Sequence, residues 1–249
     1  MNFTSPEQTL HFIKQNNVIH LDTAGRYPPS CPARSEEGFN IDTKILAQSG
    51  GNRGGMRRDA VKTSLNTSLR RVNTLHIHMP DLEAPLKVQA VVLNYLYQQG
   101  NLEFPTSNQN YYRNFSVYQD DYSVVTRGME NKLLPILREQ RIAYNVIRIL
   151  TSAFLSGKLT HGPAEGTCVD GDSPIGKAMQ NIYNNESLHN ALKTLEETTR
   201  SFHITTINVA LQGDRITRGA SSIDRIRSNM KRINKGPLPE EYVKTFEDI

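Results

Sequence analysis

The stretch Val18-Ile-His-Leu-Asp22-Thr-Ala-Gly-Arg-Tyr27 decides the fold, because a short, largely apolar run ends in a group of polar side chains. Two later stretches, Phe39-Asn-Ile-Asp-Thr-Lys44 and Thr74-Leu-His-Ile-His78-Met, repeat this arrangement. In a parallel α/β barrel the carboxyl ends of the strands meet at one rim, where reactive groups gather. We therefore expect Asp22, Tyr27, Lys44 and His78 to converge on one ligand.

The rest of the chain alternates between strand and helix patterns, which is typical of a parallel sheet covered by helices. Apolar runs predict strands at residues 18–24, 39–46, 74–79, 102–106, 116–122, 143–150 and 215–219. Helical spacing and start signals predict helices from Ser5, at residues 59–72, 84–98, 130–140 and 187–202, and from Ser222. Residues 157–177, rich in Gly and Pro, are expected to form a long mobile loop.

Size and composition bound the function classes. The 249 residues suit one α/β barrel or two small domains. The net charge of +4 is mild, and the basic C-terminal residues surround an apolar stripe at helical spacing, which favours a solvated helix over a nucleic-acid surface. Cys31 and Cys168, with no long apolar stretch at the N-terminus, favour a reducing cytoplasmic location and no membrane span.

The order of these segments resembles the aldo-keto reductases, and within them the aflatoxin-aldehyde-reductase-like branch. The similar segments are Leu21-Asp-Thr-Ala-Gly-Arg-Tyr-Pro, Ile41-Asp-Thr-Lys44, His76-Ile-His-Met-Pro-Asp81, Val117-Tyr-Gln119 and Gly219-Ala-Ser-Ser222. The resemblance implies a single α/β domain over residues 1–249, of the (β/α)8 TIM-barrel type. Seven strands are recognisable and the first is missing, so an incomplete barrel is expected.

The resemblance also implies catalytic roles. Tyr27 would be the general acid, Lys44 and Asp22 would tune it, and His78 would orient or polarise a carbonyl. These roles make physical sense, because a phenol with a pKa near 10 needs an adjacent cation to donate a proton at neutral pH. Lys44 would be that cation, and a buried ammonium needs a carboxylate such as Asp22.

The same resemblance implies NADP as cofactor. Ser107, Asn108 and Gln119 would hold the nicotinamide carboxamide. The phosphate and adenosine end would contact Gly219, Ser221, Ser222, Arg225 and Asn229. An arginine at 225 favours the 2'-phosphate of NADP over NAD.

Some segments depart from the family pattern. The spacing from Tyr27 to Lys44 is shorter than in the family. The segment Ile147-Arg-Ile-Leu-Thr-Ser-Ala153 stands where the family has a stacking aromatic and two glycines, so this chain lacks them. The leading hypothesis is NADPH-dependent reduction of a small-molecule aldehyde or ketone, in detoxification or secondary metabolism. The alternative is a catalytically inactive, truncated relative.

Two further points stay open from sequence. A homodimer is one option for the assembly. His76 and His78 face the same side of a strand, so they are also compatible with a metal site that takes His20, Asp22 and Asp81 as further ligands. We expect no metal ion to bind there, because His20, Asp22 and Asp81 lack the spacing of such sites.

Overall fold

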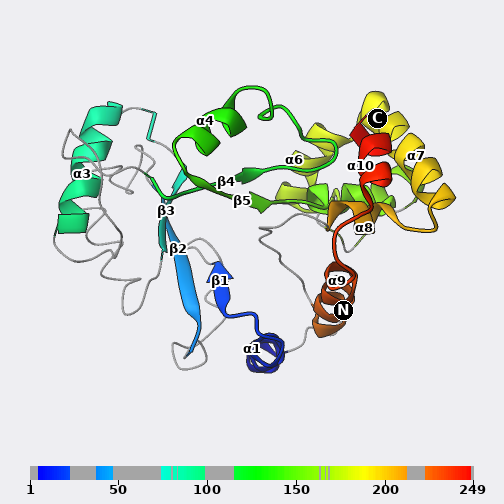
Figure 1. Cartoon of the computed structure of the whole chain (residues 1–249), viewed down its shortest axis with the longest axis horizontal. Coiled ribbons are helices and arrows are strands. Elements are labelled where there is room, and N and C mark those ends of the chain that lie inside the picture. The colour runs from blue at the N-terminus through cyan, green and yellow to red at the C-terminus, as the bar shows by residue number, and fades with distance from the viewer. Residues whose placement is uncertain are drawn as a thin grey trace. The chain divides into compact units, whose positions relative to one another are not determined.

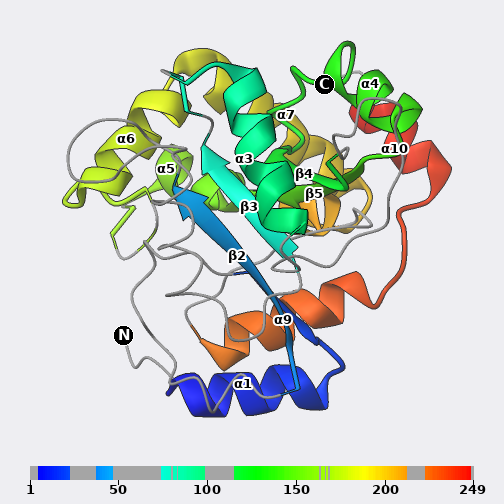
Figure 2. The same ribbon diagram turned by 90° about the vertical axis from the view of Figure 1, so that its left-hand side faces the viewer.

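The structure, a computed structural model, describes residues 5–22, 38–46, 74–79, 81–82, 84–98, 115–162, 164–165, 167, 169–211 and 222–247. It divides into two compact units, Met1–Asn114 and Phe115–Ile249, and each is described by itself (Figures 1 and 2). The single domain expected over residues 1–249 stays a prediction. The helix predicted at 59–72 and the strands predicted at 102–106 and 215–219 lie outside the described residues.

The first unit begins with helix α1, Pro6–Gln15. Its start is a complete capping box, in which the Ser5 side chain accepts from Gln8 N and the Gln8 side chain accepts from Ser5 N. Leu10 and Ile13 are buried, so the predicted apolar face of this helix is confirmed.

Three parallel strands follow, and they form a sheet in the order β1-β2-β3 (Figure 1). Strand β1 is His20–Asp22, β2 is Asn40–Leu46 and β3 is Thr74–Met79. Each lies inside its predicted range, and the parallel direction is the one that alternating strands and helices predicted. Helix α3, Leu86–Gln98, follows β3 within the predicted range 84–98.

The second unit begins with a βαβ element. Strand β4, Val117–Asp121, is linked through helix α4, Leu133–Glu139, to the parallel strand β5, Ala143–Ile147. Parallel neighbours need a crossover of this kind, because a tight turn cannot join them. All three elements lie within the ranges predicted from sequence.

The remainder of the second unit is helical. Its elements are η1 (Thr151–Ser156), α5 (Lys158–His161), α6 (Pro174–Tyr183), α7 (Glu186–Ser201), α8 (Thr206–Ala210), α9 (Ile223–Ile233) and α10 (Glu240–Glu247). All of these elements except α9 contribute residues to, or pack against, a buried apolar core that comprises Phe154, Leu155, Tyr183, Leu192, Leu195 and Phe246. None of the helices in the described part of the chain is long and apolar enough to cross a membrane.

The prediction of a long loop at residues 157–177 is wrong in part, because this segment contains α5 and the start of α6. Ser173 caps α6 by accepting from Gly176 N, and Pro174 occupies the first turn. Gly176 is needed for packing, since a Cβ there would lie 1.6 Å from the carbonyl oxygen of Asp170. The Pro and Gly residues thus begin a helix instead of marking a loop.

Candidate active site

An ion pair between Asp22, at the end of β1, and Lys44, in β2, forms the centre of the site. Lys44 Nζ lies 2.5 Å from both carboxylate oxygens of Asp22. The side chains of Lys44 and Asp22 are only 6% and 16% exposed. Charges so far removed from water need a partner, because burial strips them of their hydration. The sequence predicted both residues, and the structure places them in contact.

Strand register explains why this contact forms. Asp22 is paired with Asp42 on β2, and Lys44 is paired with His76 on β3. Residues two apart on a strand share a face, and so do paired residues on neighbouring strands. One face of the sheet, here called the polar face, therefore carries His20, Asp22, Asn40, Asp42, Lys44, Thr74, His76 and His78. The opposite face carries Leu21, Ile41, Thr43, Leu75 and Ile77.

His78 is half-buried on β3 and lies on the polar face. The structure thus brings Asp22, Lys44 and His78 to one face of one sheet. Tyr27 lies outside the described residues. The catalytic roles of all four residues stay predictions.

The turn after β3 is held by Gln89 of α3, a residue that sequence analysis did not single out. The Gln89 side chain donates to the carbonyl oxygens of Asp81 and Ala84, both at 2.7 Å, and accepts from Asp81 N at 3.3 Å. Gln89 is 4% exposed and Asp81 is 3% exposed. These buried bonds fix the backbone three residues after His78 and so support the end of β3. A single polar residue within the otherwise apolar run of residues 88–93 was the available signal.

His76 is a second residue to which sequence analysis gave no catalytic part, having considered it only as a possible metal ligand. It is 8% exposed, and within the described residues its Nε2 has no hydrogen-bond partner. Burial lowers the pKa of His76, and the Lys44 ammonium lowers it further, while Asp42 and Asp22 act in the opposite direction. The ring is therefore neutral near pH 7. Among the residues that the structure describes, no three His, Cys, Asp or Glu side chains are grouped as ligands of a metal ion.

The predicted cofactor residues that the structure describes all lie in the second unit. Gln119 is half-buried in β4, paired with Asn145 of β5. Ser222 caps α9 by accepting from Arg225 N at 3.3 Å. Arg225 is exposed in the first turn of α9, and Asn229 is half-buried one turn later. Ser107, Asn108, Gly219 and Ser221 lie outside the described residues.

The segment that departs from the family pattern has an unusual backbone. Ser152 has φ 55° and Ala153 has φ 78°, both in the left-handed region that glycine adopts most easily. By the resemblance described under Sequence analysis, these two residues stand where the family is expected to have glycines. The chain therefore keeps a glycine-type backbone without the glycines. Nearby, Arg148 Nη1 lies 2.5 Å from Asp121 Oδ2 and joins the ends of β4 and β5.

Several tyrosines of the second unit are unsuited to proton donation at neutral pH. Burial and a hydrogen bond to Asp120 raise the pKa of Tyr118 to about 12, and burial and Glu130 raise the pKa of Tyr122 to about 12. Burial raises the pKa of Tyr144 and of Tyr183 as well. A general acid needs the opposite shift of its pKa, which a nearby cation or hydrogen bonds donated to the phenolate oxygen can provide.

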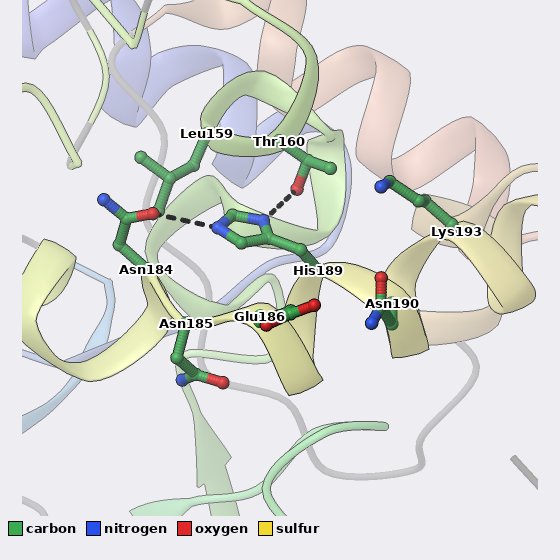
Figure 3. Close-up of a pocket in the computed structure, with 8 residues that line it drawn as sticks. All are labelled: Leu159, Thr160, Asn184, Asn185, Glu186, His189, Asn190 and Lys193. Carbon is green, nitrogen blue, oxygen red and sulfur yellow. Dashed lines mark hydrogen bonds between the residues drawn. The ribbon is translucent and has the colours of Figure 1, made fainter.

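A separate surface cavity of about 410 Å³ lies between α5 and the start of α7 (Figure 3). His189 crosses it, with Nδ1 2.9 Å from the Thr160 hydroxyl and Nε2 2.9 Å from Asn184 Oδ1. Because the Asn184 oxygen can only accept, Nε2 carries the ring hydrogen and Nδ1 accepts from Thr160. Both ring nitrogens are engaged, so His189 links α5 to α7 structurally.

Comparison with known proteins identifies relatives over most of the chain, although no family model matches it. The chain is 26% identical over 249 residues to an aldo-keto reductase of Pseudocercospora fijiensis, covering 86% of this chain and 84% of the relative. It is 24% identical to aflatoxin B1 aldehyde reductase member 2 of Rattus norvegicus, covering 99% and 80%. The aldo-keto reductase AKR11C1 of Bacillus halodurans superposes with a TM-score of 0.71 at 16% identity, covering 99% and 88%.

These similarities confirm the predicted class, an α/β protein of the (β/α)8-barrel type. The described residues contain five strands in parallel sheets, three in the first unit and two in the second. The chain is a homologue of the aldo-keto reductases, which are oxidoreductases, and its relatives include the aflatoxin aldehyde reductases, as the sequence resemblance predicted.

Proposed function

We propose that this protein reduces an aldehyde or ketone to the corresponding alcohol, with NADPH as hydride donor. The observation that carries the proposal is the buried Lys44–Asp22 ion pair on the same face as His78. The aldo-keto reductase relatives support it independently.

The charges of this chain suit a proton transfer to a carbonyl oxygen. Asp22 fixes the Lys44 ammonium through two bonds of 2.5 Å, so that its positive charge stays on the polar face. In the proposed site this charge lowers the pKa of the Tyr27 phenol, which donates its proton to the oxygen as negative charge develops. The imidazole of His78 donates a hydrogen bond to the same oxygen. The product is an alcohol, and Tyr27 regains a proton from solvent.

The residues present are compatible with a dinucleotide. When bound, NADPH would supply a hydride for the carbonyl carbon, while the residues of this chain would place the two reactants. The Gln119 side chain has the donor and acceptor that a carboxamide requires. Arg225 lies in the first turn of α9, where the helix dipole disfavours a cation. An exposed arginine at this position is explained by binding an anion, for which the 2'-phosphate is our candidate.

The finer features of the function belong to the same proposal. Several relatives are named aflatoxin B1 aldehyde reductases, which supports a role in detoxification, while secondary metabolism is the other setting that we consider. The inactive relative considered from sequence finds no support in the comparisons. A cytoplasmic location and a homodimer stay predictions.

Loss of NADPH absorbance with 4-nitrobenzaldehyde as substrate tests the proposal. The wild-type protein should turn over, and Lys44→Met should lose at least about a hundredfold in kcat, the usual scale for losing acid–base assistance. A variant of an exposed lysine, Lys177→Met in α6, serves as the matched control and should keep wild-type turnover. Turnover that is equal in the wild type and Lys44→Met would reject the assignment.

A further inference from the structure

His76 is a buried titratable side chain on the polar face to which the mechanism above gives no part. It is 8% exposed, and its Nε2 lacks a hydrogen-bond partner within the described part of the chain. A buried ring nitrogen normally has such a partner, since leaving it bare costs free energy. Because this buried nitrogen lowers the stability of the fold, packing alone does not explain a histidine at position 76.

The neighbours of His76 are the charges of the proposed active site. Lys44 is its register partner on β2. Asp42 and Lys44 of β2, Asp22 of β1 and His78 of β3 are the charged and titratable groups that act on it. His76 therefore stands directly beside the ion pair on which the reactivity of Tyr27 depends.

We propose that His76 is a positioning residue of the carbonyl-reduction site: its neutral ring leaves Asp22 to bind Lys44 alone, and its protonation in acid disrupts this pair and stops the reaction. The inference rests on the proposed function. A protonated ring places a second positive charge near Asp22 and Asp42, in surroundings of low dielectric constant. Asp22 is then shared between two cations, and the Lys44 ammonium loses its fixed position.

The electrostatics agree with this geometry. Burial and the Lys44 charge both lower the pKa of His76, so the ring is mostly neutral near pH 7 and becomes protonated only in acid. The site is thus active above the pKa of His76 and inactive below it.

The test compares pH profiles of kcat and KM for NADPH-dependent reduction of 4-nitrobenzaldehyde in the wild type, His76→Gln and His20→Gln. Glutamine places a polar nitrogen near the position of Nε2 and cannot become charged. His20 is the matched control, because it lies on the polar face, is exposed, and contacts Asn40 at 3.4 Å. The wild type and His20→Gln should lose about tenfold in kcat per pH unit below the pKa of His76, and His76→Gln should lack this decline.

The outcomes separate this inference from the proposed function. No turnover by the wild type at pH 7.5 overturns both, whereas turnover with the same acid limb in all three proteins overturns only the role of His76. Circular dichroism at each pH shows whether the variants are folded. Should His76→Gln not fold, NMR of the wild type decides: the ¹⁵N signal of the Lys44 ammonium must shift with the midpoint of His76, and a constant signal overturns the inference.

Discussion

Lys44 Nζ binds both carboxylate oxygens of Asp22 at 2.5 Å, and the pair is almost removed from solvent. Its two halves are not independent, because removing one leaves the other as a buried charge without compensation.

Removal of one half should therefore cost more than removal of both. Asp22→Asn is expected to lower the free energy of unfolding by about 3 kcal/mol or more, and Lys44→Met by a similar or smaller amount. The double variant Asp22→Asn/Lys44→Met should lose less than either single variant. Urea unfolding of the four proteins measures the coupling, and strictly additive losses would contradict the buried pair.

Tyr27→Phe is expected to abolish aldehyde reduction while NADPH affinity stays nearly unchanged, because the phenol acts on the developing alkoxide. Quenching of NADPH fluorescence measures binding, and single-turnover oxidation measures the chemistry. Tyr122→Phe is the matched control, since the Tyr122 hydroxyl donates to Glu130 at 2.6 Å and has its pKa raised to about 12. Loss of turnover in Tyr122→Phe alone would show that the general acid is not Tyr27 and lies in the second unit.

Arg225→Gln is expected to weaken NADPH binding by about tenfold or more, as for loss of a charge-assisted contact, and to leave NADH binding unchanged. Arg227→Gln is the control, because Arg227 already pairs with Asp224 at 2.6 Å in the same helix. Titration with both dinucleotides tests the preference. Equal weakening of NADPH and NADH binding would show that Arg225 does not bind the 2'-phosphate.

Local signals in the sequence predicted many elements well. The capping box at Ser5 gave the start of α1, and the apolar run at residues 74–79 gave the full length of β3. These features depend on neighbouring residues, so the sequence contains them directly. The Pro and Gly residues around Ser173 were misinterpreted, because the same residue types begin helices and form loops.

The sequence predicted which residues at the strand ends belong to the site, but it did not predict the burial and hydrogen bonds of the residues around them. The order of the strands indicated that Asp22 and Lys44 would meet. The burial of His76 and the bonds of Gln89 depend on strand register and on how α3 packs, which no local pattern determines. Sequence analysis therefore found Asp22, Lys44 and His78, considered His76 only as a metal ligand, and missed Gln89.

The low pKa of His76 predicts a loss of stability in acid. The unfolded chain binds a proton near pH 6.5, whereas burial and Lys44 hold the folded pKa below that value. As pH falls below 6.5 the unfolded state takes up protons first, so the free energy of unfolding decreases until the folded pKa is passed. Urea midpoints measured between pH 7.5 and 5 should fall less in His76→Gln than in His20→Gln. An equal fall in both would contradict the shift.

Ala153 adopts φ 78°, in the left-handed region that glycine adopts most easily, so Ala153→Gly is expected to stabilise the protein. The left-handed conformation costs a residue with a Cβ about 1–2 kcal/mol, and glycine avoids this cost at a smaller loss of chain entropy. We expect a gain of about 0.5–1 kcal/mol in the free energy of unfolding. Ala178→Gly, at an exposed position inside α6, is the matched control and should lose about 0.5–1 kcal/mol. Thermal and urea unfolding of both variants measure the two signs, and a loss in Ala153→Gly as large as that in the control would show that residue 153 is not left-handed.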